Sequence, residues 1–162
     1  MDIATNLLEQ ARERAAAEKL QIAFEEGDAE QLPYADGGFD VVMSMFGAMF
    51  APRPELAARE LLRVCRSGGQ IAMANWRSEG FVAQTFQIAA RHIPPPPGLV
   101  PPTQWGDEVV VRERFGNGVS KIETTRRRVE FRYPFGPKGA VEFVRKYFGP
   151  TVASFSRLDV NG

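Results

Sequence analysis

The stretch Phe39-Asp40-Val41-Val42-Met43-Ser44-Met45-Phe46 is nearly continuously apolar, and it decides the fold class. A run of this kind is typical of a strand that is covered on both faces, as in a parallel sheet. A second such run, residues 70–76, follows it along the chain. Between the two, the pattern of residues 55–65 predicts a helix that stops at Gly68-Gly69. Alternation of strands and helices predicts an α/β domain with a mostly parallel sheet.

On the N-terminal side of this unit, the sequence predicts a helix followed by an extended run. Leu7, Leu8, Ala11 and Ala15 share one apolar stripe. Thr5 or Asn6 is expected to cap this helix through its side-chain oxygen. The run Leu20 to Phe24 is expected to be extended and to end in the turn-forming segment Gly27-Asp28.

On the C-terminal side, the pattern changes. Residues 81–92 and 139–148 are predicted to be helical, and a proline-rich connection follows the first of these. Residues 122–133 alternate in part between apolar and charged side chains. That alternation predicts an edge or antiparallel strand with one wet face in the rear part of the fold.

The overall composition excludes several classes of function. Of the 162 residues, 20 are Lys or Arg and 20 are Asp or Glu, so no net charge favours nucleic acid or a membrane surface. No apolar run has the roughly 20 residues that a membrane span requires. Cys65 has no partner for an internal disulfide, which favours a cytoplasmic protein. His92 is the single histidine, and without Cys or His partners at ligand spacing we expect no metal site.

Candidate ligand-binding residues stand where strands of an open α/β sheet would end. Ligands bind there, beyond the carboxyl ends of the strands. Asp2 precedes the first helix, and a carboxylate there can accept hydrogen bonds from both hydroxyls of a ribose. Asp28 and Ala29 follow the extended run and can meet an adenine edge. Met45 and Phe46 end the second run and offer a soft apolar wall. Taken singly, each also has a purely structural interpretation: a chain end, a turn former and ordinary core.

Four segments in order resemble the class I S-adenosylmethionine-dependent methyltransferases, in particular those related to ubiquinone and menaquinone biosynthesis enzymes. They are Asp2 to Arg12, Gly27 to Tyr34, Phe39 to Val42 and Glu60 to Gly69, where the family usually has proline at the position of Ser67. The resemblance covers residues 2–76. It implies a Rossmann-like fold, with residues 1–76 as a partial cofactor-binding half and 77–162 as a variable substrate or cover region of one domain.

The resemblance also implies roles for the candidate residues and a cofactor. Asp2, with Ile3 beside it, would hold the ribose hydroxyls of S-adenosylmethionine. Asp28 and Ala29 would meet the adenine, and Met45 and Phe46 would line the pocket near the sulfonium. The implied reaction is methyl transfer to a small-molecule acceptor, for which the residues name no catalytic base.

This sequence departs from the family pattern at both ends. The family begins with a strand and a Gly-x-Gly-x-Gly loop, and nothing of the kind precedes Asp2 here. The family's final strand is also missing from the pattern, so the fold is expected to be incomplete. Unpaired backbone edges and bare apolar faces would result, and a homodimer that covers them is one hypothesis. Cofactor binding is accordingly expected to be weak or absent.

Two hypotheses other than an active methyltransferase stay open on the sequence alone. The first is that the chain is a non-catalytic remnant that persists as a dimeric binding or interaction module. A nicotinamide-dependent dehydrogenase shares the α/β pattern, but the order of the Gly-Asp-Ala and Arg-Ser-Gly-Gly segments favours the methyltransferase.

Overall fold

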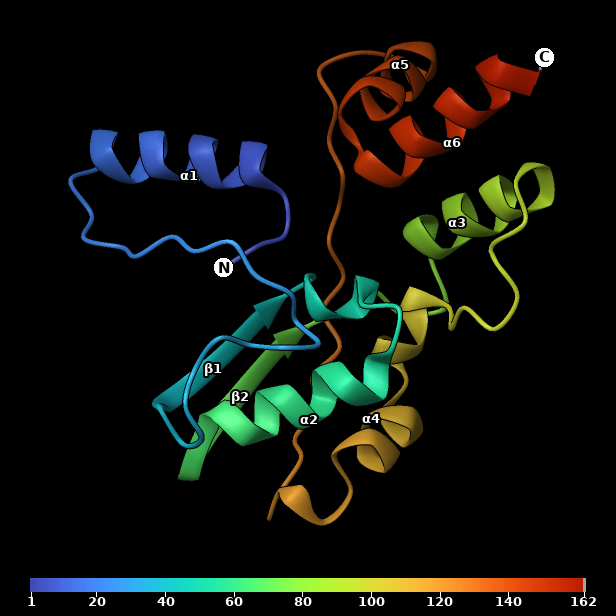
Figure 1. Ribbon diagram of the computed structural model, residues 1–162. Helices are drawn as coiled ribbons and strands as arrows, with labels where there is room; N and C mark the ends of the chain where they lie inside the picture. The colour runs from blue at the N-terminus through green and yellow to red at the C-terminus, as the bar shows by residue number, and fades with distance from the viewer. Residues whose placement is uncertain (162) are drawn as a thin grey trace. The chain divides into compact units, whose positions relative to one another are not determined.

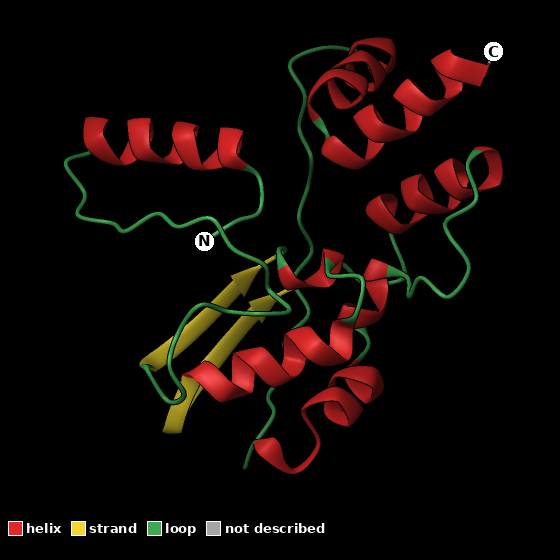
Figure 2. Ribbon diagram, viewed as in Figure 1, coloured by secondary structure: helices red, strands yellow, loops and turns green. Residues whose placement is uncertain are grey.

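Two parallel strands form the sheet of this protein. In the computed structural model, which describes residues 1–161, β1 (Phe39–Met45) pairs with β2 (Cys65–Ala74), as Figures 1 and 2 show. The register sets Val42 beside Ile71 and Met45 beside Ala74. The predicted α/β class and the parallel pairing are therefore confirmed.

The register breaks near the amino end of the sheet, between Phe39 and Val41. Gly69 lies at this break, where a Cβ atom would come within 2.8 Å of the Asp40 carbonyl oxygen. Only glycine fits so close to another backbone. The Cys65 thiol lies 3.7 Å from the Gln70 carbonyl oxygen, within the same irregularity. The prediction that Gly68-Gly69 ends the helix was wrong in detail, because the helix ends at Val64 and both glycines belong to β2.

Helix α2 (Pro54–Val64) covers one face of the sheet and supplies four of the nine buried residues of the core. Pro54 suits the start of the helix because its missing N–H would have no partner there. The buried side chains of α2 pack with Val42 of β1. These α2 residues are Ala57, Ala58, Leu61 and Val64. The short 3₁₀ helix η1 (Ala48–Phe50) links β1 to this layer.

Residues 99–122 complete this core from farther along the chain. Trp105 of the 3₁₀ helix η2 (Pro102–Gly106) and Phe115 of α4 (Glu108–Phe115) are both buried in it. A Cβ at Gly106 would come within 2.5 Å of the Trp76 carbonyl oxygen, so η2 lies directly against the chain that leaves β2. A further short turn, η3 (Gly116–Gly118), follows α4.

An ion-pair network fixes the loop before β1 to α2. The Arg63 guanidinium donates to the Glu60 carboxylate at 2.7 Å and to Asp36 at 2.8 Å. It also donates to the carbonyl oxygens of Leu32 and Tyr34. The hydrogen bond from Arg63 lowers the pKa of Glu60, and the same bond raises the pKa of Arg63. A segment without regular structure thereby gains a defined position.

The N-terminal region differs from its prediction in two respects. Helix α1 (Thr5–Ala17) begins at Thr5 itself, so neither Thr5 nor Asn6 caps it, and Ala4 stands at the cap without a side-chain bond. Residues 20–24 form no strand. Next to this run, Asp2 and Glu26 form an isolated parallel bridge. Leu20 and Ile22 are exposed, so neither side chain gains the burial that would hold the run in a sheet.

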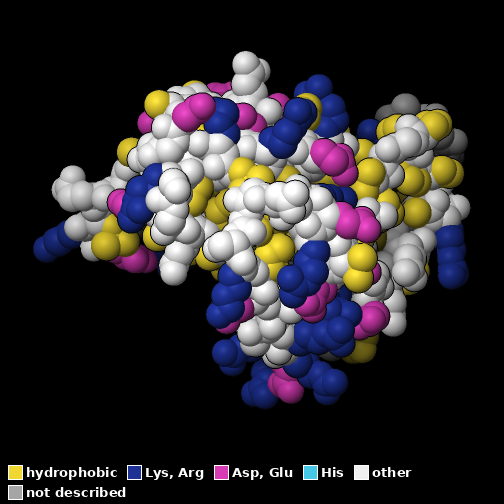
Figure 3. All heavy atoms as spheres, turned by 90° about the horizontal axis from the view of Figure 1, so that it is seen from below, with side chains coloured by type: hydrophobic (Ala, Val, Ile, Leu, Met, Phe, Trp, Pro, Cys, Tyr) yellow, Lys and Arg dark blue, Asp and Glu magenta, His cyan; other side chains and the backbone are white. Residues whose placement is uncertain are grey.

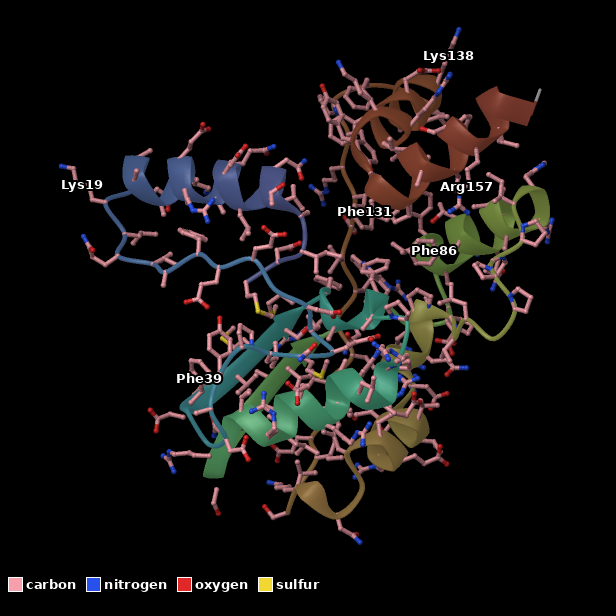
Figure 4. The ribbon with its side chains drawn as sticks, in the orientation of Figure 1. Lys19, Phe39, Phe86, Phe131, Lys138 and Arg157 are labelled. Carbon is pink, nitrogen blue, oxygen red and sulfur yellow. The ribbon has the colours of Figure 1, made fainter. Side chains whose placement is uncertain are left out.

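The chain divides into two compact units: residues 1–78 with 99–122, and residues 79–98 with the part from 123 on. The second unit holds α3 (Phe81–His92), α5 (Pro137–Tyr147) and α6 (Gly149–Asn161). The Phe86 and Phe148 rings stack at 6.2 Å, and Phe81 meets Phe131 at 6.0 Å (Phe86 and Phe131 are labelled in Figure 4). That the two units together form a single domain stays a prediction.

The antiparallel strand expected at residues 122–133 is not present, and this part of the prediction was wrong. The segment is without regular structure and has no ladder partner within the described chain. Nearly all of its side chains are exposed to solvent, so its apolar and charged residues do not divide into a buried and an exposed face. No helix within residues 1–161 is long and apolar enough to cross a membrane.

Candidate functional site

The carboxyl end of β1 is built around an unusual backbone conformation. The Phe46 amide donates to the Ala74 carbonyl oxygen at 2.9 Å, which ties the ends of β1 and β2 together. Phe46 has a φ of 62°, in the left-handed region that a bulky side chain rarely occupies. Strained residues of this kind occur often at binding sites. The turn aims the Phe46 ring at Trp76, and the two rings stack with centroids 4.5 Å apart.

Asp2 lies where a short piece of parallel pairing joins the start of the chain to residues 25–27. The Asp2 amide donates to the Glu25 carbonyl oxygen at 3.2 Å, and the Gly27 amide donates to the Asp2 carbonyl oxygen at 3.1 Å. The Asp2 carboxylate accepts a bond from the Ala4 amide at 2.9 Å, immediately before α1. Asp2 and Ile3 are both exposed. Asp2 therefore lies just before α1 and takes part in an isolated bridge, not in a strand.

Asp28 and Ala29 form a turn directly after that pairing. The Asp28 carboxylate accepts from the Glu30 amide at 2.8 Å, and the Asp28 carbonyl oxygen accepts from the Gln31 amide. Glu30 is buried and its carboxylate receives the Arg53 backbone amide and, at 2.6 Å, the Arg53 side chain. The turn is thus anchored to the residue that precedes α2.

The structure brings the six candidate residues together as two groups. The first group consists of Asp2, Ile3, Asp28 and Ala29. Gly27 connects its two halves, because its amide donates to the Asp2 carbonyl oxygen and it directly precedes Asp28. Met45 and Phe46 form the second group, at the end of β1. The Met45 side chain is 59% exposed, so it is not the core residue that the structural interpretation suggested.

Sequence reasoning missed several residues that support this site. A Cβ at Gly27 would lie 2.5 Å from the sulfur of the flexible Met1 side chain, so Met1 packs directly against this glycine. Glu30 gave no signal, because nothing in the sequence marks one acidic residue among many as buried. The sequence does not decide whether Trp76 and Trp105 line a pocket or fill the core. In the structure Trp76 stacks on Phe46, and Trp105 is buried in the core.

Two other features complete the survey of the described chain. A surface hollow lies between α1 and the segment after it, lined by Arg12, Ala15, Leu20 and Ile22 among others, and none of the six candidate residues lines it. Within residues 1–161, no group of three His, Cys, Asp or Glu side chains could hold a metal ion.

Comparison with known proteins identifies the N-terminal part. Residues 1–73 match the model of a family described as a methyltransferase domain. These residues belong to the methyltransferase domain family. The match contains all six candidate residues, both groups of the site and the whole of α2.

Two relatives are similar to different shares of the chain. An uncharacterized protein of Mycobacterium tuberculosis is 34% identical over 161 residues, which is 99% of this chain and 59% of that protein. A protein of Deinococcus radiodurans named demethylmenaquinone methyltransferase is 33% identical over 96 residues, 58% of this chain and 40% of that one. The chain therefore spans about three fifths of the length of the Mycobacterium protein.

A solved structure shows the same fold. The YcgJ protein of Bacillus subtilis superposes with a TM-score of 0.50 at 22% identity, over 70% of this chain and 49% of that chain. At this level of identity the likeness concerns the fold alone. The protein thus has an α/β, Rossmann-like architecture. Strands β1 and β2 form its sheet, and helix α2 packs on one face of that sheet.

Proposed function

We propose that this protein takes part in the transfer of a methyl group from S-adenosylmethionine to a small-molecule acceptor. The observation that carries the proposal is the match of residues 1–73 to the methyltransferase domain family, together with the methyltransferase name of the Deinococcus relative. The chain spans 59% of its Mycobacterium relative, and the activity of the whole protein is part of the proposal.

The first group of site residues would hold the adenosine part of the cofactor. The Asp2 carboxylate is exposed beside the start of α1, where it can accept hydrogen bonds from ribose hydroxyls. Asp28 and the Ala29 backbone lie one residue beyond the Asp2–Gly27 pairing, which suits an adenine edge next to the ribose. Ile3, exposed between Asp2 and α1, would cover the nucleoside.

The second group would lie against the sulfonium end. Met45 and Phe46 present a thioether and a ring, both polarisable and without a charge that would repel a cation. When bound, the cofactor supplies a methyl group on a positively charged sulfur. The protein's own contribution would be to align the acceptor with that carbon and to exclude water. No side chain of this group is a general base.

The remaining partners follow from the same proposal. The acceptor is a small molecule, and we assign neither nucleic acid nor membrane as a partner, because the balanced charge attracts neither. We place the protein in the cytoplasm, where its one cysteine stays reduced.

Calorimetric titration with S-adenosylhomocysteine tests the proposal. We expect the purified chain to bind it weakly at most, and we expect Asp2→Asn or Asp28→Asn to weaken any such binding at least about tenfold, since each removes a charged acceptor. Asparagine retains the oxygen that accepts from Ala4 or Glu30, so both variants should keep the local fold. Asp40→Asn at the opposite end of β1 is the matched control and should bind normally.

Three results would overturn this function or its site. Absence of binding heat from a folded sample would move the chain to the non-catalytic class of interaction modules. Equal affinity of all four proteins would show that the nucleoside binds elsewhere. Displacement by NADH but not by S-adenosylmethionine would revive the dehydrogenase.

A further inference from the structure

Arg114 of α4 carries a buried charge that its neighbours satisfy only in part. Its side chain is 4% exposed. The guanidinium Nη2 donates to the Gln104 side-chain oxygen at 3.3 Å. The Nε atom lies 3.7 Å from the Glu55 carboxylate, which is an ion pair too long for a normal hydrogen bond. Within residues 1–161, the buried Nε and Nη1 atoms have no hydrogen-bond acceptor.

Another arginine of the same helix shows the usual arrangement. Arg112 donates to the Glu108 carboxylate at 2.6 Å, and both side chains are about half exposed. Figure 3 shows Lys and Arg side chains next to Asp and Glu side chains on the face that it draws. Water also solvates such exposed charges, whereas a buried guanidinium without acceptors costs folding free energy. Burial lowers the pKa of Arg114 for the same reason.

A second buried donor lies beside Arg114. The guanidinium carbon is 4.6 Å from the centre of the Trp105 ring, and Trp105 is 2% exposed. The indole Nε1 of Trp105 is buried, and no group of the described chain accepts its hydrogen. Two neighbouring side chains therefore both present N–H groups without acceptors. Buried donors are nearly always paired in native proteins, so this arrangement indicates a ligand that accepts hydrogen bonds and carries negative charge.

The arrangement belongs to one compact unit, residues 1–78 with 99–122. Trp105 lies in the core of this unit together with Phe115, the residue that follows Arg114, so the burial arises within the unit itself. The two side chains in polar contact with the guanidinium, Glu55 and Gln104, are both exposed. Rotation of these two side chains away from Arg114 would open a path for a ligand.

We propose that Arg114 and Trp105 form a binding site for a small organic carboxylate. The guanidinium would donate charge-assisted hydrogen bonds to the carboxylate, and the indole N–H would donate a neutral one. A singly charged group suits the site, because Glu55 already places one negative charge near the guanidinium. The Trp105 ring would contact the apolar part of the ligand. The site joins α2, α4 and η2, and it is separate from the proposed methyl transfer and does not rest on it.

Fluorescence of Trp105 tests the proposal without any cofactor. Trp76→Phe leaves Trp105 as the one tryptophan of the full chain, and this parent protein is titrated with sodium acetate at an ionic strength held constant with sodium chloride. We expect a saturable change in emission. Arg114→Met should raise the dissociation constant at least about tenfold, because it removes the charged donors and keeps a long apolar side chain. Arg112→Met is the matched control and should bind acetate as the parent does.

A second variant separates loss of the site from loss of the fold. Glu55→Gln removes the negative charge that lies 3.7 Å from Nε, so it should lower the dissociation constant for acetate about threefold or more. Tighter binding cannot result from a weakened fold. Sodium phosphate should bind to the parent at least about threefold more weakly than acetate, because Glu55 repels its higher charge more strongly.

The contrary results are equally defined. A folded parent protein whose emission shows no saturable change with acetate overturns the proposal. Equal affinities of Arg114→Met and the parent would place the anion elsewhere. Weaker binding by Glu55→Gln would contradict the charge balance of the site, and phosphate binding tighter than acetate would exclude a carboxylate as its ligand.

Discussion

The two faces of the sheet have nearly the same sequence character and opposite environments. On the covered face, Val42 is buried against α2 together with Leu61 and Val64. On the other face, Met43 and Met45 are more than half exposed (Figure 1 shows α2 over one face of the strands). The difference shows that an apolar run does not by itself bury all of its side chains: Val42 packs with the residues of α2, whereas its neighbours on the other face do not.

The largest expected effect is on the covered face. Leu61→Ala should lower the free energy of unfolding by about 3 kcal/mol, because it removes a buried side chain and leaves a cavity between α2 and the sheet. Urea unfolding followed by circular dichroism measures it. Met43→Ala is the comparison, and its cost should be smaller than that of Leu61→Ala, because Met43 is more than half exposed. Equal costs for both variants would break the distinction between the faces.

A somewhat smaller effect is expected where the two strands approach most closely. Gly69→Ala should cost about 2 kcal/mol, since the new methyl group would meet the Asp40 and Arg66 carbonyl oxygens at 2.8 and 2.9 Å. Gly149→Ala, where a Cβ has open space, serves as its control in the same unfolding experiment. If Gly69→Ala is as stable as the wild type, the register break in β2 is not as described.

A third effect depends on pH. Glu60→Gln should lower the free energy of unfolding by about 1–2 kcal/mol at pH 7, because it replaces a charged hydrogen bond to Arg63 with a neutral one. The folded pKa of Glu60 is lowered from 4.5, so its stabilisation is present above pH 4.5 and is lost as the pH falls through the folded value. The two proteins should therefore converge in stability as the pH falls below 4.5 and through the lowered pKa of Glu60. A difference that grows on acidification would contradict the role of Arg63.

The smallest effect is expected at the exposed end of the sheet. Asp40→Asn removes a pair with Arg66 in which both side chains are more than half exposed. Such surface pairs contribute about 0–1 kcal/mol. A thermal melt should show almost no change, and added salt should reduce what remains. A loss as large as that of Gly69→Ala would show that this end of the sheet is held by charge.

Much of the fold follows from local patterns in the sequence. The helices at 54–64, 81–92 and 137–147 agree with their predictions to within two residues, because apolar periodicity and flanking proline or glycine determine them. The runs at 20–24 and 122–133 have strand-like patterns but no neighbouring strand. A strand depends on a partner far away in the sequence, so its pattern alone does not decide its state.

The expectation that candidate residues follow strands agrees with the structure at Met45 and Phe46, where β1 ends. Asp2 and Asp28 take part in isolated bridges, and no strand ends at either of them. The left-handed conformation of Phe46, its stacking on Trp76 and the burial of Glu30 were not predictable. Each of these depends on how β1, β2 and α2 meet in three dimensions. The roles of Asp2, Ile3, Asp28, Ala29, Met45 and Phe46 toward a cofactor stay predictions.

The thiol at the register break gives this protein a built-in reporter. Cys65 is its one cysteine, it is partly buried, and it lies against the Gln70 carbonyl oxygen. A thiol reagent would therefore react at a rate set by the opening of the amino end of β2. Comparing that rate with the rate of global unfolding would show whether the sheet frays from this end while α2 stays folded.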